Sequence, residues 1–371
     1  MATDVLADDR ALREGRRERA FAQMEAHDLD VLVLGRQANV RYFTGAPQLW
    51  IAGTRPFGPM CTVVRATREI YLNSTWDEGM PDDIPHDHLY GLAWNPMTLV
   101  SVLQNIDGAA TARRVGTDAL SPTFAKLLPM AFPNAELVDG ELAMRAARRI
   151  KTPEEVIAIR SALRVAEHGL AAAVAELRPG ISEQSLAGVL LEAMAAGGVS
   201  TPATQDAAWI TSREHPWRRA RAARVQDGDL VALKAGVVAD GYVGEVGRTY
   251  CVGGDNDAIR NLYRRSNALS DKLITACRPG AVASDLFAVY ESAGEPLPPM
   301  PVAHGLGLGF DPPVVTPRLP DTAAAERLDP GMVLAVTGYV WEQGVGAVFS
   351  RDAVLITADG PEVLTARTTS A

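Results

Sequence analysis

Charged side chains interrupt apolar, strand-like segments in the second half of this 371-residue chain. Lys234 follows the apolar run 230–233, Glu245 lies eleven residues further on, and Arg351 lies within 348–355. A guanidinium fork suits a carboxylate or another planar anion, and a lysine adds a second positive charge. Because charges in such surroundings are more typical of working sites than of inert cores, these residues are candidates for binding a small anion. The alternative is an internal ion-pair cluster that only fills space.

Three residues have the chemistry for proton transfer. His215 and His304 carry imidazoles, whose pKa lies near neutral pH, and Glu245 can accept a proton or orient a histidine. The glycines beside His304 would let a ligand approach the backbone closely. Each histidine also has a simpler interpretation without a catalytic role. His215 precedes Pro216 and suits a surface loop, and His304 would do no more than form a hydrogen bond with Glu245.

Aromatic residues surround these positions in the sequence. Such side chains often wall a small-molecule pocket, but they are as often plain core. The residues predicted to contact substrate are Lys234, Tyr242, Thr337, Tyr339, Trp341 and Arg351. Trp209 and Trp217 lie nearby in the sequence.

Composition excludes several classes of function. The net charge is -9, which argues against broad nucleic-acid binding. No apolar run approaches the roughly 18–20 residues that span a membrane, and the N-terminus shows no secretory pattern. Cys61, Cys251 and Cys277 lie far apart and predict neither disulfides nor a metal pattern. We therefore expect a cytoplasmic protein that does not bind membranes.

The chain is long enough for two domains, which we place at 1–147 and 148–371. In the first, strands alternate with helical stretches, which indicates an α/β unit. Its predicted elements are a helix at 9–27, strands at 29–35, 114–118 and 135–139, and a hairpin at 63–64 and 70–72. In the second, Thr152 and Pro153 begin a helix that should run to about 177, and another should run from Ser182 to 197–198. From Trp209 onward the pattern is strand-rich.

Several motifs resemble the pita-bread family, which includes methionine aminopeptidase, aminopeptidase P, prolidase and the metal-free creatinase. They occur in the family's order, at 39–45, 149–155, 177–183, 228–236 and 240–250. The resemblance implies a creatinase-type N-terminal domain with a mixed sheet, followed by an α+β pita-bread domain. It also implies a homodimer in which the N-terminal domain of one chain borders the pocket of the other. Trp50, Arg55 and Phe57 are candidates to reach that neighbouring pocket.

The same resemblance assigns five positions to the family's metal ligands: Lys234, Glu245, His304, Thr337 and Arg351. Only Glu245 and His304 are still able to bind a metal. Two added cations repel the ions that would occupy the site, so the sequence predicts no metal and no other cofactor. Sliding the last motif by one residue would offer Asp352 in place of Arg351, but Lys234 would remain.

The resemblance also implies a reaction. In creatinase a pocket histidine corresponding to His215 allows C–N hydrolysis without metal, although the spacing to Asp229 is about two residues longer here. Creatinase's pocket glutamates correspond to Gly247 and Arg351, so creatine is not assigned as substrate. We expect a metal-independent, creatinase-like hydrolase of a small anionic substrate that uses His215 with Glu245 or His304. The alternatives are a non-catalytic peptide- or metabolite-binding relative, or a biosynthetic lyase, cyclase or isomerase.

Overall fold

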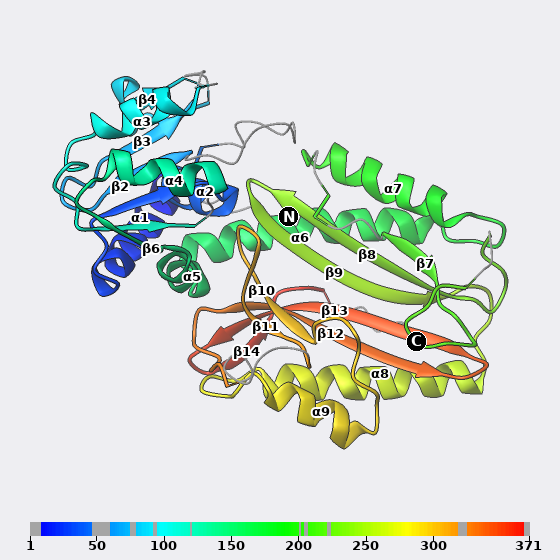
Figure 1. Ribbon diagram of the computed structural model, residues 1–371. Coiled ribbons are helices and arrows are strands. Elements are labelled where there is room, and N and C mark those ends of the chain that lie inside the picture. Colours follow the sequence, from blue (N-terminus) through cyan, green and yellow to red (C-terminus); the bar gives the residue numbers. More distant parts are fainter. Residues whose placement is uncertain are drawn as a thin grey trace. The chain divides into compact units, whose positions relative to one another are not determined.

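The computed structural model divides into two compact units, Ala7–Arg148 and Arg149–Ala371 (Figure 1). Each unit has its own sheet and its own apolar core. The residues that the structure describes are 9–46, 60–74, 79–91, 95–118, 121–199, 202–203, 207–220, 224–317 and 325–366.

A six-stranded mixed sheet forms the centre of the N-terminal unit, in the order β4-β3-β2-β1-β5-β6. Within it, β1 (Val31–Leu34) pairs antiparallel with β2 (Cys61–Val64) and parallel with β5 (Arg114–Thr117). The other strands are β3 (Ile70–Asn73), β4 (Leu89–Tyr90) and β6 (Glu136–Asp139). The helices are α1 (Asp9–Ala26), α2 (Gln37–Thr44), α3 (Pro96–Gln104), α4 (Pro122–Ala131), α5 (Glu141–Arg149) and a 3-10 turn at His86–His88. The predicted α/β unit and its β2–β3 hairpin are confirmed.

An antiparallel sheet runs through the C-terminal unit in the order β11-β10-β12-β13-β9-β8-β7, and β14 pairs with β13. Its strands are β7 (Ala208–Ile210), β8 (Leu230–Ala239), β9 (Tyr242–Cys251), β10 (Ala303–Leu306), β11 (Phe310–Val315), β12 (Val333–Glu342), β13 (Gly346–Thr357) and β14 (Gly360–Val363). Asp240 and Gly241 both have positive φ in the turn between β8 and β9. An Asp-Gly pair suits such a two-residue hairpin turn, which fixes the register of these two long strands.

Four helices accompany this sheet: α6 (Pro153–Ala175), α7 (Glu183–Ala196), α8 (Asp257–Ala276) and α9 (Asp285–Ala293). Thr152 caps α6 as predicted: its side chain accepts from the backbone N–H of Glu155, and the carboxylate of Glu155 accepts from the backbone N–H of Thr152, which completes a capping box. Helix α6 packs on β8 and β9, whereas α8 packs on β12 and β13 (Figure 1). No helix among the described residues is long and apolar enough to cross a membrane.

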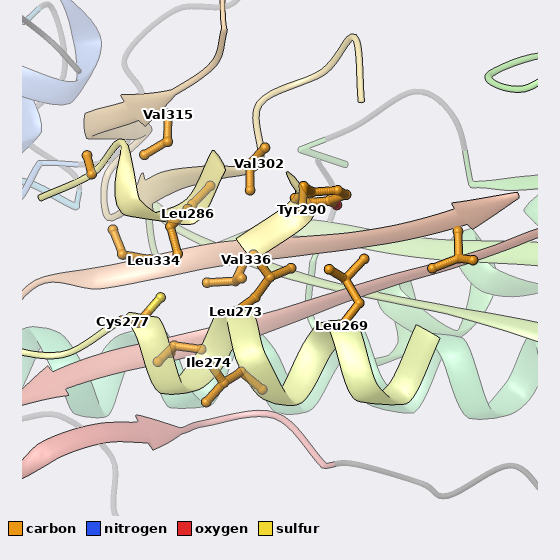
Figure 2. Close-up of a cluster of buried hydrophobic side chains, with 14 of the residues drawn as sticks. Leu269, Leu273, Ile274, Cys277, Leu286, Tyr290, Val302, Val315, Leu334 and Val336 are labelled. Carbon is orange, nitrogen blue, oxygen red and sulfur yellow. The ribbon is translucent and has the colours of Figure 1, made fainter. Parts of the chain in front are cut away.

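The core between α8, α9 and β12 holds the strands that carry the candidate site. Figure 2 shows Leu269 and Leu273 of α8 and Leu286 of α9 beside Leu334 and Val336 of β12. At the edge of this core, the hydroxyl of Tyr290 donates to the backbone carbonyl of residue 337 over 2.8 Å. Since successive strand residues point to opposite sides, burying Leu334 and Val336 against α8 turns the odd-numbered residues of β12 to the other face.

Candidate functional site

Three charged side chains meet on one face of the C-terminal sheet because they share Gly247 as a neighbour. In the strand register, Gly247 of β9 lies opposite Lys234 of β8 and opposite Arg351 of β13. Paired residues on antiparallel strands point to the same face, and so does Glu245, two residues before Gly247. His304 reaches the same place from β10. The structure therefore brings together four of the residues that the sequence singled out.

Glu245 is the centre of this cluster and has no exposed surface. Its Oε2 accepts from Nη1 of Arg351 over 2.7 Å and lies 3.3 Å from Nε2 of His304. Its Oε1 lies 3.9 Å from Nζ of Lys234 and accepts no hydrogen bond from the described residues. Arg351 also donates from Nε to the hydroxyl of Thr337 over 3.0 Å, which fixes the guanidinium plane.

The charges of the cluster determine its protonation states. Burial alone would raise the pKa of Glu245, but the imidazole of His304 and the positive charges of Arg351 and Lys234 outweigh it and lower the pKa to about 2. Burial lowers the pKa of His304 below its usual value, with the nearby cations adding to the effect and the carboxylate opposing it. At neutral pH the cluster is thus an ionised Glu245, a neutral His304 and two cations.

The cluster does not fit the two-metal centre of the family that the sequence resembles. Within the cluster, Glu245 and His304 are the only side chains able to act as metal ligands, and the carboxylate of Glu245 already accepts a hydrogen bond from the guanidinium of Arg351. Where the structure describes the chain, no group of three or more His, Cys, Asp or Glu side chains could hold a metal ion. The alternative ligand, Asp352, lies on the opposite face, where it accepts from Arg248 and Thr365. Arg351 is therefore the residue that faces the site.

A cavity of about 190 Å³ lies against this cluster. Its lining combines cationic and aromatic side chains: Trp209, Trp217, Arg218, Arg219, Lys234, Met300, Tyr339, Phe349 and Arg351. Glu245 and His304 do not belong to this lining and are buried behind it. Gly247 contributes to its shape, because a Cβ at that position would collide with the ring of Phe349.

Trp217 and Tyr339 form one wall of the cavity. Their rings lie 3.8 Å apart between centroids, and the backbone N–H of Trp217 donates to the hydroxyl of Tyr339 over 3.0 Å. Trp217 has a φ of 64°, which is uncommon for a bulky residue. Such a backbone persists only where its surroundings hold it, and it is often found at binding sites.

Tyr339 lines the cavity, but three other predicted substrate contacts do not. Tyr242 is wholly buried on the opposite face of β9, where its hydroxyl donates to Glu155 of α6, so its prediction is wrong. Thr337 is also wholly buried and supports Arg351 rather than a ligand. Trp341 donates from Nε1 to the carbonyl of Ser212 and steadies the adjoining loop.

His215 lies apart from Glu245 and His304. It is exposed on the loop after β7, where its backbone N–H donates to the hydroxyl of Ser212. This loop lines a second, more polar hollow of about 340 Å³, and among the described residues Arg218 and Arg219 line both this hollow and the first cavity. The predicted pairing of His215 with Glu245 or His304 is therefore not formed, and the hollow around His215 is separate.

Part of the cavity lining comes from residues that the sequence does not single out. Met300, Arg218 and Arg219 come from irregular segments whose positions leave no periodic signal. Phe349 lies two residues before Arg351 on β13, so strand alternation alone would have placed it on the same face. The predicted contacts Trp50, Arg55 and Phe57 lie outside the described residues.

Comparisons with known proteins agree with this architecture. The model of the Creatinase/Prolidase N-terminal domain matches residues 16–150, and that of Metallopeptidase family M24 matches residues 157–358. An uncharacterised hydrolase/peptidase of Sinorhizobium fredii is 26% identical over 364 residues, which cover 92% of each chain. Creatinase of a Bacillus species is 23% identical over 379 residues, covering 94% of this chain and 89% of creatinase.

Among solved structures, the prolidase of Pyrococcus horikoshii OT3 shares the fold with a TM-score of 0.77. The similarity covers 96% of this chain and 99% of the prolidase at 22% sequence identity. This likeness spans both the mixed sheet of the first unit and the antiparallel sheet of the second. The chain therefore belongs to metallopeptidase family M24, the pita-bread family, with a creatinase-type N-terminal domain.

Proposed function

We propose that this protein is a metal-independent, creatinase-like hydrolase that cleaves a C–N bond in a small anionic substrate. One observation carries the proposal: Lys234 and Arg351 line the cavity and flank the ionised Glu245 at positions that resemble the family's metal ligands. Fixed cations can attract an anionic substrate without a metal ion. A guanidinium held in one plane is well suited to a carboxylate.

The buried pair Glu245 and His304 has a positioning role in this proposal. Glu245 binds Nη1 of Arg351, and Thr337 binds its Nε, whereas Nη2 has no partner among the described residues. Nη2 belongs to a side chain that lines the cavity, so it is the N–H edge left for a substrate anion. His304 stays neutral beside the carboxylate and adds no further charge to the site.

His215 is our candidate for the proton transfers, acting from the adjoining hollow. The imidazole would take a proton from water while the water oxygen bonds to the substrate carbon. The C–N bond then breaks, and the same proton passes from the imidazole to the leaving nitrogen. General acid-base catalysis of this kind contributes roughly 10²–10⁴-fold, so orientation of the substrate by Arg351 and Lys234 must supply much of the rest.

The proposal is tested with protein freed of metal by EDTA and a panel of N-acyl and N-carbamimidoyl amino acids. We expect release of an amine or urea, seen by mass spectrometry, that Mn²⁺, Co²⁺ or Zn²⁺ does not increase. Arg351→Gln should abolish the reaction, whereas Arg260→Gln, at an exposed ion pair on α8, should leave it unchanged. Activity that appears only after Mn²⁺ is added would overturn the proposal.

A non-catalytic binding protein is the second candidate. It is favoured by one observation: Glu245 and His304 are buried behind the cavity, and His215 lies in another hollow. Binding of an anion with no turnover by any member of the panel would support it over the hydrolase.

We also propose a homodimer, as the family resemblance implies. Sedimentation velocity on the full chain tests this directly. A single species with the mass of one chain, 39.6 kDa, would contradict it.

A further inference from the structure

The walls of the cavity are more aromatic than anion binding alone requires. Trp217 packs on Tyr339, and Trp209 packs on Phe349 with ring centroids 5.4 Å apart. Both pairs line the cavity beside Lys234 and Arg351. Both tryptophans are only partly buried, so part of each indole is open to solvent or to a ligand. An acyclic, fully polar anion would leave these aromatic surfaces without contacts.

The size of the cavity limits what can occupy it. Its volume is about 190 Å³. An apolar protein cavity of about 150 Å³ holds one benzene molecule. The additional volume is enough for one small substituent on a single ring, so a single ring fits the cavity.

The cationic and aromatic parts of the cavity are adjacent. The guanidinium carbon of Arg351 lies 5.7 Å from the centroid of the Phe349 ring. A ligand whose anionic group meets Nη2 of Arg351 would therefore have its attached carbon atoms beside an aromatic wall. Planar rings stack on such walls with about 0.5–1.5 kcal/mol beyond the area that they bury.

We propose that the cavity selects a carboxylic acid built on one planar ring, with the carboxylate at Arg351 and Lys234 and the ring between the aromatic walls. This inference rests on the anion site of the proposed function and names its substrate class. The ring contacts Trp217, and the bond to be cleaved lies toward Arg218 and Arg219, where the cavity adjoins the hollow of His215.

Isothermal titration calorimetry of the full chain without metal tests the selection with three probes. Benzoate has the ring and the charge, hexanoate has the charge on an open chain of similar size, and benzamide has the ring without the charge. We expect benzoate to bind at least 10-fold more tightly than either of the others. Equal affinity for benzoate and hexanoate would overturn the inference.

Two substitutions at one position separate ring selection from general loss of structure. Trp217→Ala should weaken benzoate binding by about 10-fold and leave hexanoate binding within about 2-fold. Trp217→Phe keeps an aromatic ring and should restore most of the preference for benzoate. If Trp217→Ala weakens both acids equally, the wall does not select rings and the inference is wrong.

This test can fail or succeed independently of the test of the proposed function, because it measures binding and not turnover. Tight benzoate binding without hydrolysis of any ring-bearing amide would support the inference and contradict the hydrolase. Turnover of acyclic substrates with no preference for ring acids would support the hydrolase and contradict the inference.

Discussion

Arg351 and Glu245 form an ion pair of 2.7 Å in which the carboxylate has no exposed surface. Their strands, β13 and β9, are neighbours in the sheet, so the pair joins two strands as well as two charges. Removing one partner of such a pair strongly destabilises the folded protein, because the remaining charge stays buried without its partner. The orientation of the guanidinium in the cavity depends on this contact.

Glu245→Gln should therefore lower the free energy of unfolding by about 3–5 kcal/mol. The measurement is equilibrium unfolding in urea at pH 7. Glu192→Gln, on the exposed side of α7, is the matched control and should change stability by less than about 0.5 kcal/mol. In the double variant Glu245→Leu with Arg351→Met, both charges are gone, and we expect much of the lost stability to return.

Acidification should destabilise the wild type through the same cluster. The folded-state pKa of Glu245 is lowered to about 2 from an ordinary 4.5, so its contribution is complete above pH 4.5 and is lost as the pH falls toward 2. At about 1.4 kcal/mol per pKa unit, this contribution amounts to roughly 3 kcal/mol. The folded-state pKa of His304 is also lowered, so its contribution begins to fall once the pH drops below 6.5.

Urea unfolding at several pH values between 7 and 3 measures both effects. Glu245→Gln should flatten the pH dependence below 4.5, and His304→Gln should reduce the loss of stability that begins below pH 6.5. Identical pH dependence in all three proteins would show that these two groups do not control acid stability.

Metal content is a direct test of the substituted ligand positions. After incubation with Mn²⁺, Co²⁺ or Zn²⁺ and gel filtration, we expect almost no metal to remain with the protein. A variant with Lys234→Asp, Thr337→Glu and Arg351→Glu supplies carboxylates beside Glu245 and His304, and should retain metal. One or two ions held tightly by the wild type would contradict the proposal that the protein acts without a metal ion.

Tyr339→Phe removes only the hydroxyl that accepts from the backbone of Trp217. We expect a loss of about 1 kcal/mol in stability and weaker benzoate binding, because Trp217 is held less firmly at its positive φ. Urea unfolding and calorimetry measure the two effects. The control is Tyr263→Phe on α8, which removes a hydroxyl that donates to the backbone carbonyl of residue 249. This variant should lower stability without changing benzoate binding.

His215→Ala should reduce turnover of any substrate by about 10²–10⁴-fold. Binding of benzoate should stay the same, because His215 does not line the aromatic cavity. An unchanged rate would exclude His215 as the acid-base group.

Local patterns in the sequence predicted much of this fold. The capping residues Thr152 and Ser182 begin α6 and α7 where expected, since a cap is a property of a few neighbouring residues. Strand alternation alone separates Tyr242 from the site, because Tyr242 and Glu245 are three residues apart on one strand and point to opposite faces. The separation of His215 from Glu245 was not predictable, since loop paths depend on tertiary contacts such as that of Trp341 with Ser212.

Gly247 has a consequence for how this protein can change over time. Its hydrogen side chain leaves the space that the Phe349 ring fills, and its register sets the cations on either side of it. A methyl group added at position 247 would collide with this ring, so a larger residue is disfavoured there while position 349 carries an aromatic residue. The two positions should covary among descendants of this chain, and an enlarged residue 247 beside a smaller residue 349 would mark lineages that had exchanged one ligand for another.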